Sequence, residues 1–173
     1  GHIGTRLRLG RKDEIGVLAD AMDTFSDDLQ ANVVGTMKKI AAGDLTTDVA
    51  AKDAQDEISP ALKATTESLR GLVAEAGMLA KAAIEGKLAT RGNAAKFAGG
   101  YHDIVKGVND TLDAVIGPLN VAAEYVDRIS KGDIPPRITD TYNGDFNELK
   151  NNLNTCSDAV NALVADAGVL MKA

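Results

Sequence analysis

The side chains that most often carry chemistry are few and widely spaced in this chain, which has two histidines and one cysteine. His2 and His102 have no second ligand at metal-binding spacing, and we interpret His102 as a solvated polar residue near a helix start. Cys156 has no neighbouring histidine and falls on an apolar helix position, which predicts a small buried thiol rather than a nucleophile. None of the glycines forms a phosphate-binding loop with a lysine. We therefore expect no catalytic residue, metal or cofactor, and no enzyme activity.

Two acidic pairs, Asp13-Glu14 and Asp56-Glu57, each precede an isoleucine. Carboxylates are favoured at the positive end of the helix dipole, so both pairs predict helix starts. Related signals recur at His102-Asp103-Ile104 and Asn147-Glu148-Leu149. The chain thus contains four predicted starts of similar helices.

A second signal consists of a glycine that ends an amphipathic helix and is followed by a short apolar segment. It occurs at Gly43-Asp44-Leu45, Gly86-Lys87-Leu88 and Gly132-Asp133-Ile134. The glycines are 43 and then 46 residues apart. A period of this length indicates an array of similar units.

Each acidic signal introduces a run of residues at alternating steps of three and four, which is a heptad pattern. We call these runs the seams; they contain Ile15, Leu18, Met22, Phe25 and Leu29, then Ile58, Leu62, Thr65, Leu69 and Leu72, then Ile104, Val108, Thr111, Val115 and Pro118, and finally Leu149, Leu153, Cys156, Val160 and Leu163. A further stripe, Val33, Met37 and Ile40, predicts a separate helix before Gly43. Between Leu69 and Ala83 no turn signal occurs, so one helix should continue there. Pro118 predicts a kink or a fresh helix start.

The connectors between these helices contain twelve or more residues, whereas antiparallel helices need a loop of about 2–5. Twelve extended residues span about 40 Å, enough to return along a helix of about 14 residues. We therefore expect successive helices to run parallel, the alternative being loose loops in an up-and-down bundle. Two short helices cannot cover their own seams, which predicts a homodimer with a four-helix bundle in each unit.

The composition limits the choice of partners. A net charge of −6 disfavours nucleic acid and anionic membrane surfaces. No apolar run is long enough to cross a bilayer, so we expect no membrane insertion of this fragment. We expect a cytoplasmic location, although the complete protein could be anchored in a membrane.

These motifs resemble HAMP domains, the relay modules of chemoreceptors and sensor histidine kinases. The resemblance is carried by Asp13-Glu14-Ile15-Gly16 and Gly43-Asp44-Leu45, with Pro118 similar to the family's proline near the start of the first helix. It divides the chain into a C-terminal half-unit at 1–29, units at 30–72, 73–117 and 118–162, and the start of another at 163–173. The last segment repeats eight of the eleven residues of 72–82.

The resemblance implies an all-α fold of stacked, parallel four-helix coiled-coil bundles that transmits helix rotation or tilt. Its partners would be a second copy and the adjacent sensor and output domains. We expect a bacterial chemoreceptor, with two alternatives: the linker array of a histidine kinase, or a passive helical spacer. The expected signalling or structural residues are Gly43, Asp44, Leu45, Gly86, Leu88, Gly132, Asp133, Pro118, Glu14, Glu57, Glu148, Thr65, Thr111 and Cys156.

Two roles are open in this set. The resemblance implies that Glu14, Glu57 and Glu148 link the second helix to the neighbouring first helix, whereas the simpler interpretation is a favourable charge at a helix start. Thr65, Thr111 and Cys156 lie midway along their seams, where Leu would pack better by about 1–3 kcal/mol. Such weak positions could keep two packing states close in energy, or they could simply be tolerated.

Overall fold

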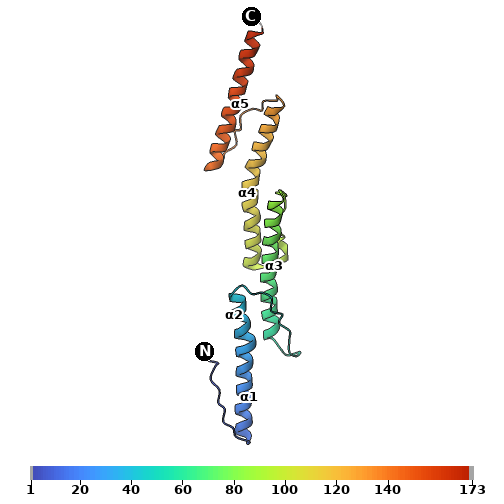
Figure 1. Cartoon of the computed structure of the whole chain (residues 1–173), viewed down its shortest axis with the longest axis vertical. Coiled ribbons are helices and arrows are strands. Elements are labelled where there is room, and N and C mark those ends of the chain that lie inside the picture. The colour runs from blue at the N-terminus through green and yellow to red at the C-terminus, as the bar shows by residue number, and fades with distance from the viewer. Residues whose placement is uncertain (1, 172–173) are drawn as a thin grey trace. The chain divides into compact units, whose positions relative to one another are not determined.

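The computed structural model describes residues 2–171, and every regular element in that range is helical (Figure 1). The elements are α1 (Glu14–Asp28), the π-helix η1 (Leu29–Val34), α2 (Gly35–Ala41), α3 (Ile58–Ile84), the 3-10 helix η2 (Ala94–Lys96), α4 (Gly99–Ser130) and α5 (Asp145–Leu170). The all-α prediction is confirmed. The chain divides into two bodies, which we describe separately: an N-terminal body of the residues up to Glu85 with Gly92–Val105, and a C-terminal body of Gly86–Arg91 with the residues from Lys106 onward.

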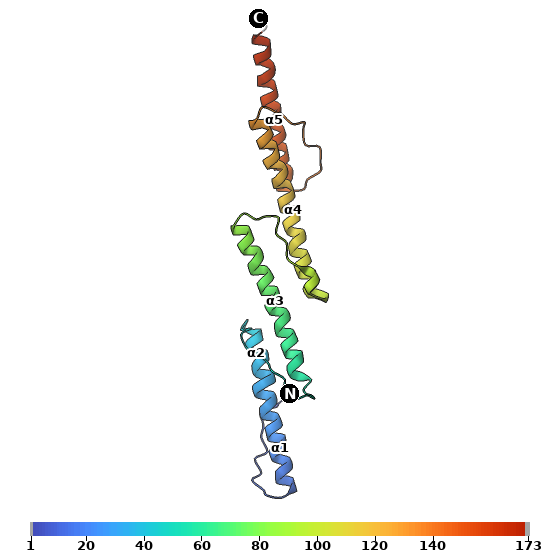
Figure 2. The ribbon, with the colours of Figure 1, turned by 90° about the vertical axis from the view of Figure 1, so that its right-hand side faces the viewer.

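In the N-terminal body, α1, η1 and α2 form one unbroken helical stretch. The predicted break between the first seam and the stripe at Val33 is therefore wrong, because no glycine or proline interrupts residues 29–34 and a π turn joins the two α-helices. The connector 42–57 returns along this stretch, and α3 then runs in the same direction beside η1 and α2 (Figures 1 and 2). The connector 42–57 is long enough to lead back along the first helical stretch, and this lets α3 run parallel to it.

The first helix of a unit ends at a glycine, as expected. Gly43, Gly86 and Gly132 have φ values of 80°, 72° and 79°, a conformation that side chains with Cβ disfavour. The N–H groups of Gly43 and Asp44 donate to the carbonyls of Ile40 and Lys39, at 2.9 Å each. This is the Schellman arrangement, which supplies partners to the last carbonyls of the helix.

Asp133 shows the same arrangement at the end of α4. Its N–H donates to the Arg128 carbonyl at 3.0 Å, and the Gly132 N–H donates to the Ile129 carbonyl at 3.0 Å. The guanidinium of Arg128 also holds the pKa of the Asp133 carboxyl below its ordinary value. The two helix ends at Gly43 and Gly132 are thus built alike, 89 residues apart in a chain of 173.

The C-terminal body contains most of α4, the connector 131–144 and α5, with α5 parallel to α4 (Figure 2). Pro118 lies inside α4, so the alternative of a fresh helix start there is wrong. The helix tolerates it because apolar positions continue on both sides and Pro118 lines a contact region with Tyr142 and Phe146. The connector contributes the buried residues Pro135 and Ile138 to this core.

The predicted helix starts are correct at two of the four positions. Helix α1 begins at Glu14 and α3 at Ile58, but α4 begins at Gly99 and α5 at Asp145, ahead of His102 and Asn147. Gly99 and Gly144 have φ values of 55° and 53°, so a glycine turn introduces these two helices. The acidic signal therefore lies within their first turns or just after them.

Candidate functional site

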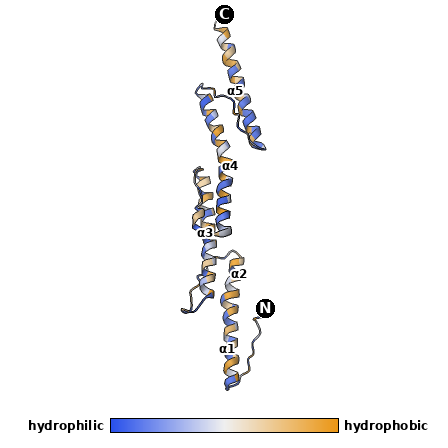
Figure 3. Ribbon diagram, turned by 180° about the vertical axis from the view of Figure 1, so that it is seen from behind, coloured by the Kyte–Doolittle hydropathy of each residue, from blue (hydrophilic) through white to orange (hydrophobic). Residues whose placement is uncertain are grey.

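Each long helix carries its seam beside a second stripe of buried residues, and on α1 the seam is exposed. On α1, Ile15, Leu18, Met22 and Phe25 are 52%, 58%, 53% and 61% exposed, whereas Gly16 and Ala19, one position later, are buried. Figure 3 shows hydrophobic residues recurring along α1 and α2. The apolar stripe of this helix is thus left uncovered by its own chain.

The seams of the other helices are less uniformly exposed, since Leu62 and Leu69 on α3 and Leu149 and Leu153 on α5 are half-buried. The buried positions lie next to the seams: Ser59 and Thr66 on α3, Val105 and Ile116 on α4, and Asn154 and Ser157 on α5. Val105, Ile116 and Asn154 lie against connector residues, and the buried residues named on α3 and α5 are polar. We call this second set the connector-facing stripe.

The residues midway along the seams are all exposed. The Thr65 hydroxyl donates to the Ala61 carbonyl at 2.9 Å, and the Thr111 hydroxyl donates to the Gly107 carbonyl at 2.8 Å. Cys156 is also exposed, so the prediction of a buried thiol is wrong for the single chain, because nothing in the described residues covers the seam of α5 at that point. The Ser157 hydroxyl, one position on, is buried instead.

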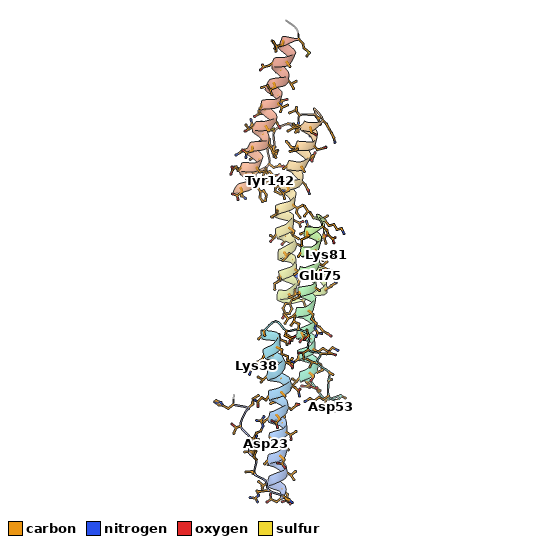
Figure 4. The ribbon with its side chains drawn as sticks, in the orientation of Figure 1. Asp23, Lys38, Asp53, Glu75, Lys81 and Tyr142 are labelled. Atoms are coloured by element: carbon orange, nitrogen blue, oxygen red, sulfur yellow. The ribbon has the colours of Figure 1, made fainter. Side chains whose placement is uncertain are left out.

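The segment before α1, residues 2–13, acts as the first connector and is held by a carboxylate of α1. Asp23 accepts the backbone N–H groups of Leu7 at 2.7 Å and Arg8 at 2.9 Å (Asp23 is labelled in Figure 4). These two hydrogen bonds stabilise the charged form and lower the pKa of Asp23. We call a helix side chain that bonds connector backbone in this way a connector anchor.

Asn154 is the equivalent anchor on α5. Its side-chain carbonyl accepts the Ile138 N–H at 2.7 Å, and its amide donates to the Ile138 carbonyl at 3.1 Å. Asp23 and Asn154 each lie 16 residues after the connector residue that they hold. Both Asn154 and Ile138 are buried, so the amide supplies the only polar partners that the described contacts show for this backbone pair.

A guanidinium is a second recurring feature of the connectors. Arg6 donates to the carbonyls of Ile3 and Thr5, and Arg91 donates to those of Leu88 and Thr90, at 2.7–3.0 Å. Each also pairs with an aspartate of the following helix, Asp27 or Asp113. Arg137 pairs in the same way with Asp158 at 2.8 Å.

The connector 42–57 reverses this arrangement. In this connector Asp48, three residues after Leu45, takes the position at which the other connectors have an arginine. The arginine comes instead from the following helix, α3. Arg70 of α3 donates to the carbonyls of Leu45 at 2.5 Å and Thr47 at 3.0 Å. The carbonyls of Leu45 and Thr47 correspond to those that Arg91 binds in the next connector. Here the guanidinium that binds them comes from the helix and not from the connector itself.

The connector 85–98 is also held on α3, its preceding helix. Glu75 is buried and accepts the Asn93 N–H at 3.0 Å and the Lys96 ammonium at 2.8 Å (Figure 4 labels Glu75). The Lys96 ammonium is the main reason that the pKa of Glu75 is lowered. Phe97 packs so close to Gly71 that a Cβ there would lie 2.9 Å from its ring.

The aspartates rather than the glutamates stabilise the predicted helix starts. Asp13 accepts the Gly16 N–H, and its pKa is lowered first by Arg11 and then by that N–H. Asp56 accepts the N–H groups of Ile58 and Ser59, and its pKa is lowered first by the side chain of Ser59 and then by the Ser59 N–H. Glu14, Glu57 and Glu148 are exposed, and their link to a neighbouring helix stays a prediction.

The remaining predicted residues lie at the start of the connectors. Asp44 accepts from Thr46, through both the hydroxyl at 2.6 Å and the N–H at 3.0 Å, which lowers its pKa. Leu45 is half-buried, and Leu88 is 44% exposed. These residues shape the turn after the glycine and place the carbonyls that the arginines bind.

Sequence reasoning missed the anchors Asp23, Arg70, Glu75 and Asn154. Polar residues beside a heptad are normally solvent-facing, so they were not distinguished from the surface. A sequence signal exists for Arg70: it lies 22 residues after Asp48, and connector arginines pair with helix aspartates at a spacing of 21 or 22 residues.

Within residues 2–171, no group of three His, Cys, Asp or Glu side chains could hold a metal ion. Over the same range, no helix combines the length and apolar content required to cross a bilayer. Two family models match the chain, and both are described as HAMP domain. One matches residues 1–31 and again 31–64, and the other matches residues 96–162.

Proposed function

The chain belongs to the HAMP domain family, whose members are signal-relay linkers in sensor proteins, and on this basis we propose that it is a tandem relay of a bacterial chemoreceptor. The observation that carries the proposal is the apolar seam, which is exposed on α1, largely exposed on α4 and only partly covered on α3 and α5, beside the connector-facing stripe. An apolar surface that recurs in every unit and that its own connector leaves uncovered is suited to one partner along its whole length.

We infer that this partner is a second copy of the chain. The parallel order of the helices in each body allows two copies to pair in register, with two helices from each copy in every bundle. The units would be 30–72, 73–117 and 118–162, between a half-unit at 1–29 and the start of another at 163–173. The array would lie in the cytoplasm between the sensor and output domains of the same protein.

Cys156 provides a direct test because it lies on the seam of α5. In a parallel, in-register dimer the two thiols face each other at the same level, so mild oxidation should produce a covalent dimer. The matched control combines Cys156→Ser with Ser157→Cys, which moves the thiol to the buried connector-facing stripe and should abolish the cross-link. A monomer in sedimentation, or equal cross-linking of the two variants, would contradict the dimer.

Relay and spacer are separated by the continuous helix α3, which joins two proposed units. One residue inserted between Leu69 and Ala83 turns everything after it by about 100° relative to the preceding seam. In the complete receptor, a relay should then give inverted or lost output, whereas a passive spacer should be unaffected. A kinase linker array would show the same sensitivity, with autophosphorylation as its readout.

A further inference from the structure

The seam changes phase by one residue between α1 and α2. After Ile15, Leu18, Met22, Phe25 and Leu29, an unbroken heptad would continue at positions 32, 36 and 39, but the apolar residues are Val33, Met37 and Ile40. One residue corresponds to about 100° around an α-helix. In a left-handed coiled coil, where the supercoil keeps the seam at 3.5 residues per turn, the second stripe would therefore leave the seam unless the helix adjusts at this point.

The π-helix η1 lies at this point of the chain. It spans Leu29–Val34, and the Gly35 N–H donates to the Gln30 carbonyl, five residues earlier. A π turn contains about one residue more than an α turn, so η1 accommodates the one-residue excess and returns Val33, Met37 and Ile40 to the seam. Helix α3 serves as an internal comparison, because its heptad runs from Ile58 to Leu79 without a shift and the helix is α throughout.

Two successive connectors bind the residues at the start of η1. Arg6, from the segment before α1, donates to Asp27 at 2.7 Å and to Gln30 at 3.0 Å. Lys52, from the connector 42–57, pairs with Asp28, which also accepts the Asn32 amide at 2.5 Å. The Lys52 ammonium is the main cause of the lowered pKa of Asp28.

We propose that η1 is a phase adapter that carries one extra residue between the seams of two successive units, and that Lys52 keeps this residue at the junction. Release of the Lys52–Asp28 pair lets the extra residue move out of η1, which turns α2 by about 100° against α1. Because Arg6 and Lys52 come from different connectors, the adapter responds to the connectors of both units. This inference rests on the parallel dimer of the proposed function.

The test is a pair of single-residue deletions in the full chain, each removing an exposed alanine. Deletion of Ala31 removes the excess, so the helix should become α throughout with one continuous heptad, and the thermal midpoint should stay or rise. Deletion of Ala74 in α3 breaks a continuous heptad and should lower the midpoint. An equal loss of stability in the two deletions would overturn the proposal.

Seam phase is read with cysteines in a Cys156→Ser background. Phe25→Cys and Met37→Cys should each cross-link two copies, both with Ala31 present and after its deletion. Lys52→Gln should cause loss of the Met37→Cys cross-link while Ala31 is present, and no loss after its deletion, since no excess residue remains to move. If neither cysteine cross-links in the parent chain, the proposed parallel dimer is wrong. If Met37→Cys cross-links only while Ala31 is present, or if Lys52→Gln has no effect on its cross-link, the proposed role of η1 as a phase adapter is wrong.

Discussion

Replacing Asn154 should release the last connector from α5. Asn154→Ala leaves the Ile138 N–H and carbonyl without the partners that they have at 2.7 and 3.1 Å. An unsatisfied buried polar group costs about 1–3 kcal/mol, and Ile138 is only 8% exposed, so the loss for the pair should be about 3 kcal/mol. That corresponds to roughly a hundredfold faster opening of the connector.

Hydrogen exchange followed by mass spectrometry measures this opening in the peptide that contains residues 134–142. The matched control is Asn152→Ala, an exposed asparagine of the same helix. The global thermal midpoint should fall by roughly 6–12 °C if the loss is shared by the whole chain, and by less if the unit opens alone. Equal exchange of Ile138 in the two variants would refute the assigned role of the Asn154 amide.

Asn154→Asp tests the direction of the two hydrogen bonds. A carboxylate can still accept the Ile138 N–H, but it faces the Ile138 carbonyl without a proton to donate, and burial disfavours its charge. Both effects raise the pKa of the new carboxyl in the folded state, so the loss of stability is present above that pKa and relieved as the pH falls below it. A variant that becomes less stable on mild acidification, in step with the parent chain, would contradict this geometry.

The remaining predictions concern the other anchors and the seam. The pKa of Asp23 is lowered in the folded chain, so its stabilising effect is present above the unfolded pKa of about 3.9 and is lost as the pH falls through the folded pKa. The thermal midpoints of Asp23→Asn and the parent chain should therefore differ at neutral pH and converge in acid. Arg70→Lys should increase hydrogen exchange in residues 43–57, because one ammonium cannot reproduce the forked contact with two carbonyls, and unchanged exchange would argue against it. Thr65→Leu should raise the thermal midpoint of the dimer by strengthening its seam and lock one output state of the complete receptor; a normal signalling range would show that the weak position is merely tolerated.

The sequence predicted the features that follow from local rules. Gly43 and Gly132 end helices because their backbone takes a conformation that few other residues adopt, and the heptads gave the helical class and the exposed stripe. The long connectors gave the parallel order, because their length is set by how far they must return.

Features that depend on contacts between segments were not predicted. Gly99 and Gly144 introduce helices earlier than the acidic signals suggested, since a glycine turn competes with a carboxylate cap and the sequence alone does not rank them. The π turn at Leu29–Val34 was visible only as a one-residue shift of the seam, which could equally have indicated a break. The anchors were hidden because Asp23 and Asn154 have the residue types of an ordinary helix surface.

The reversed position of the arginine limits how pieces of the array can be exchanged. A chimera that joins the connector 42–57 to α5 would set Asp48 opposite Asp158, with two negative charges and no guanidinium for the connector carbonyls. The reciprocal chimera would bring Arg137 and Arg70 to one place. A unit can therefore be transplanted together with its own second helix, but its connector alone is not interchangeable with those of the neighbouring units.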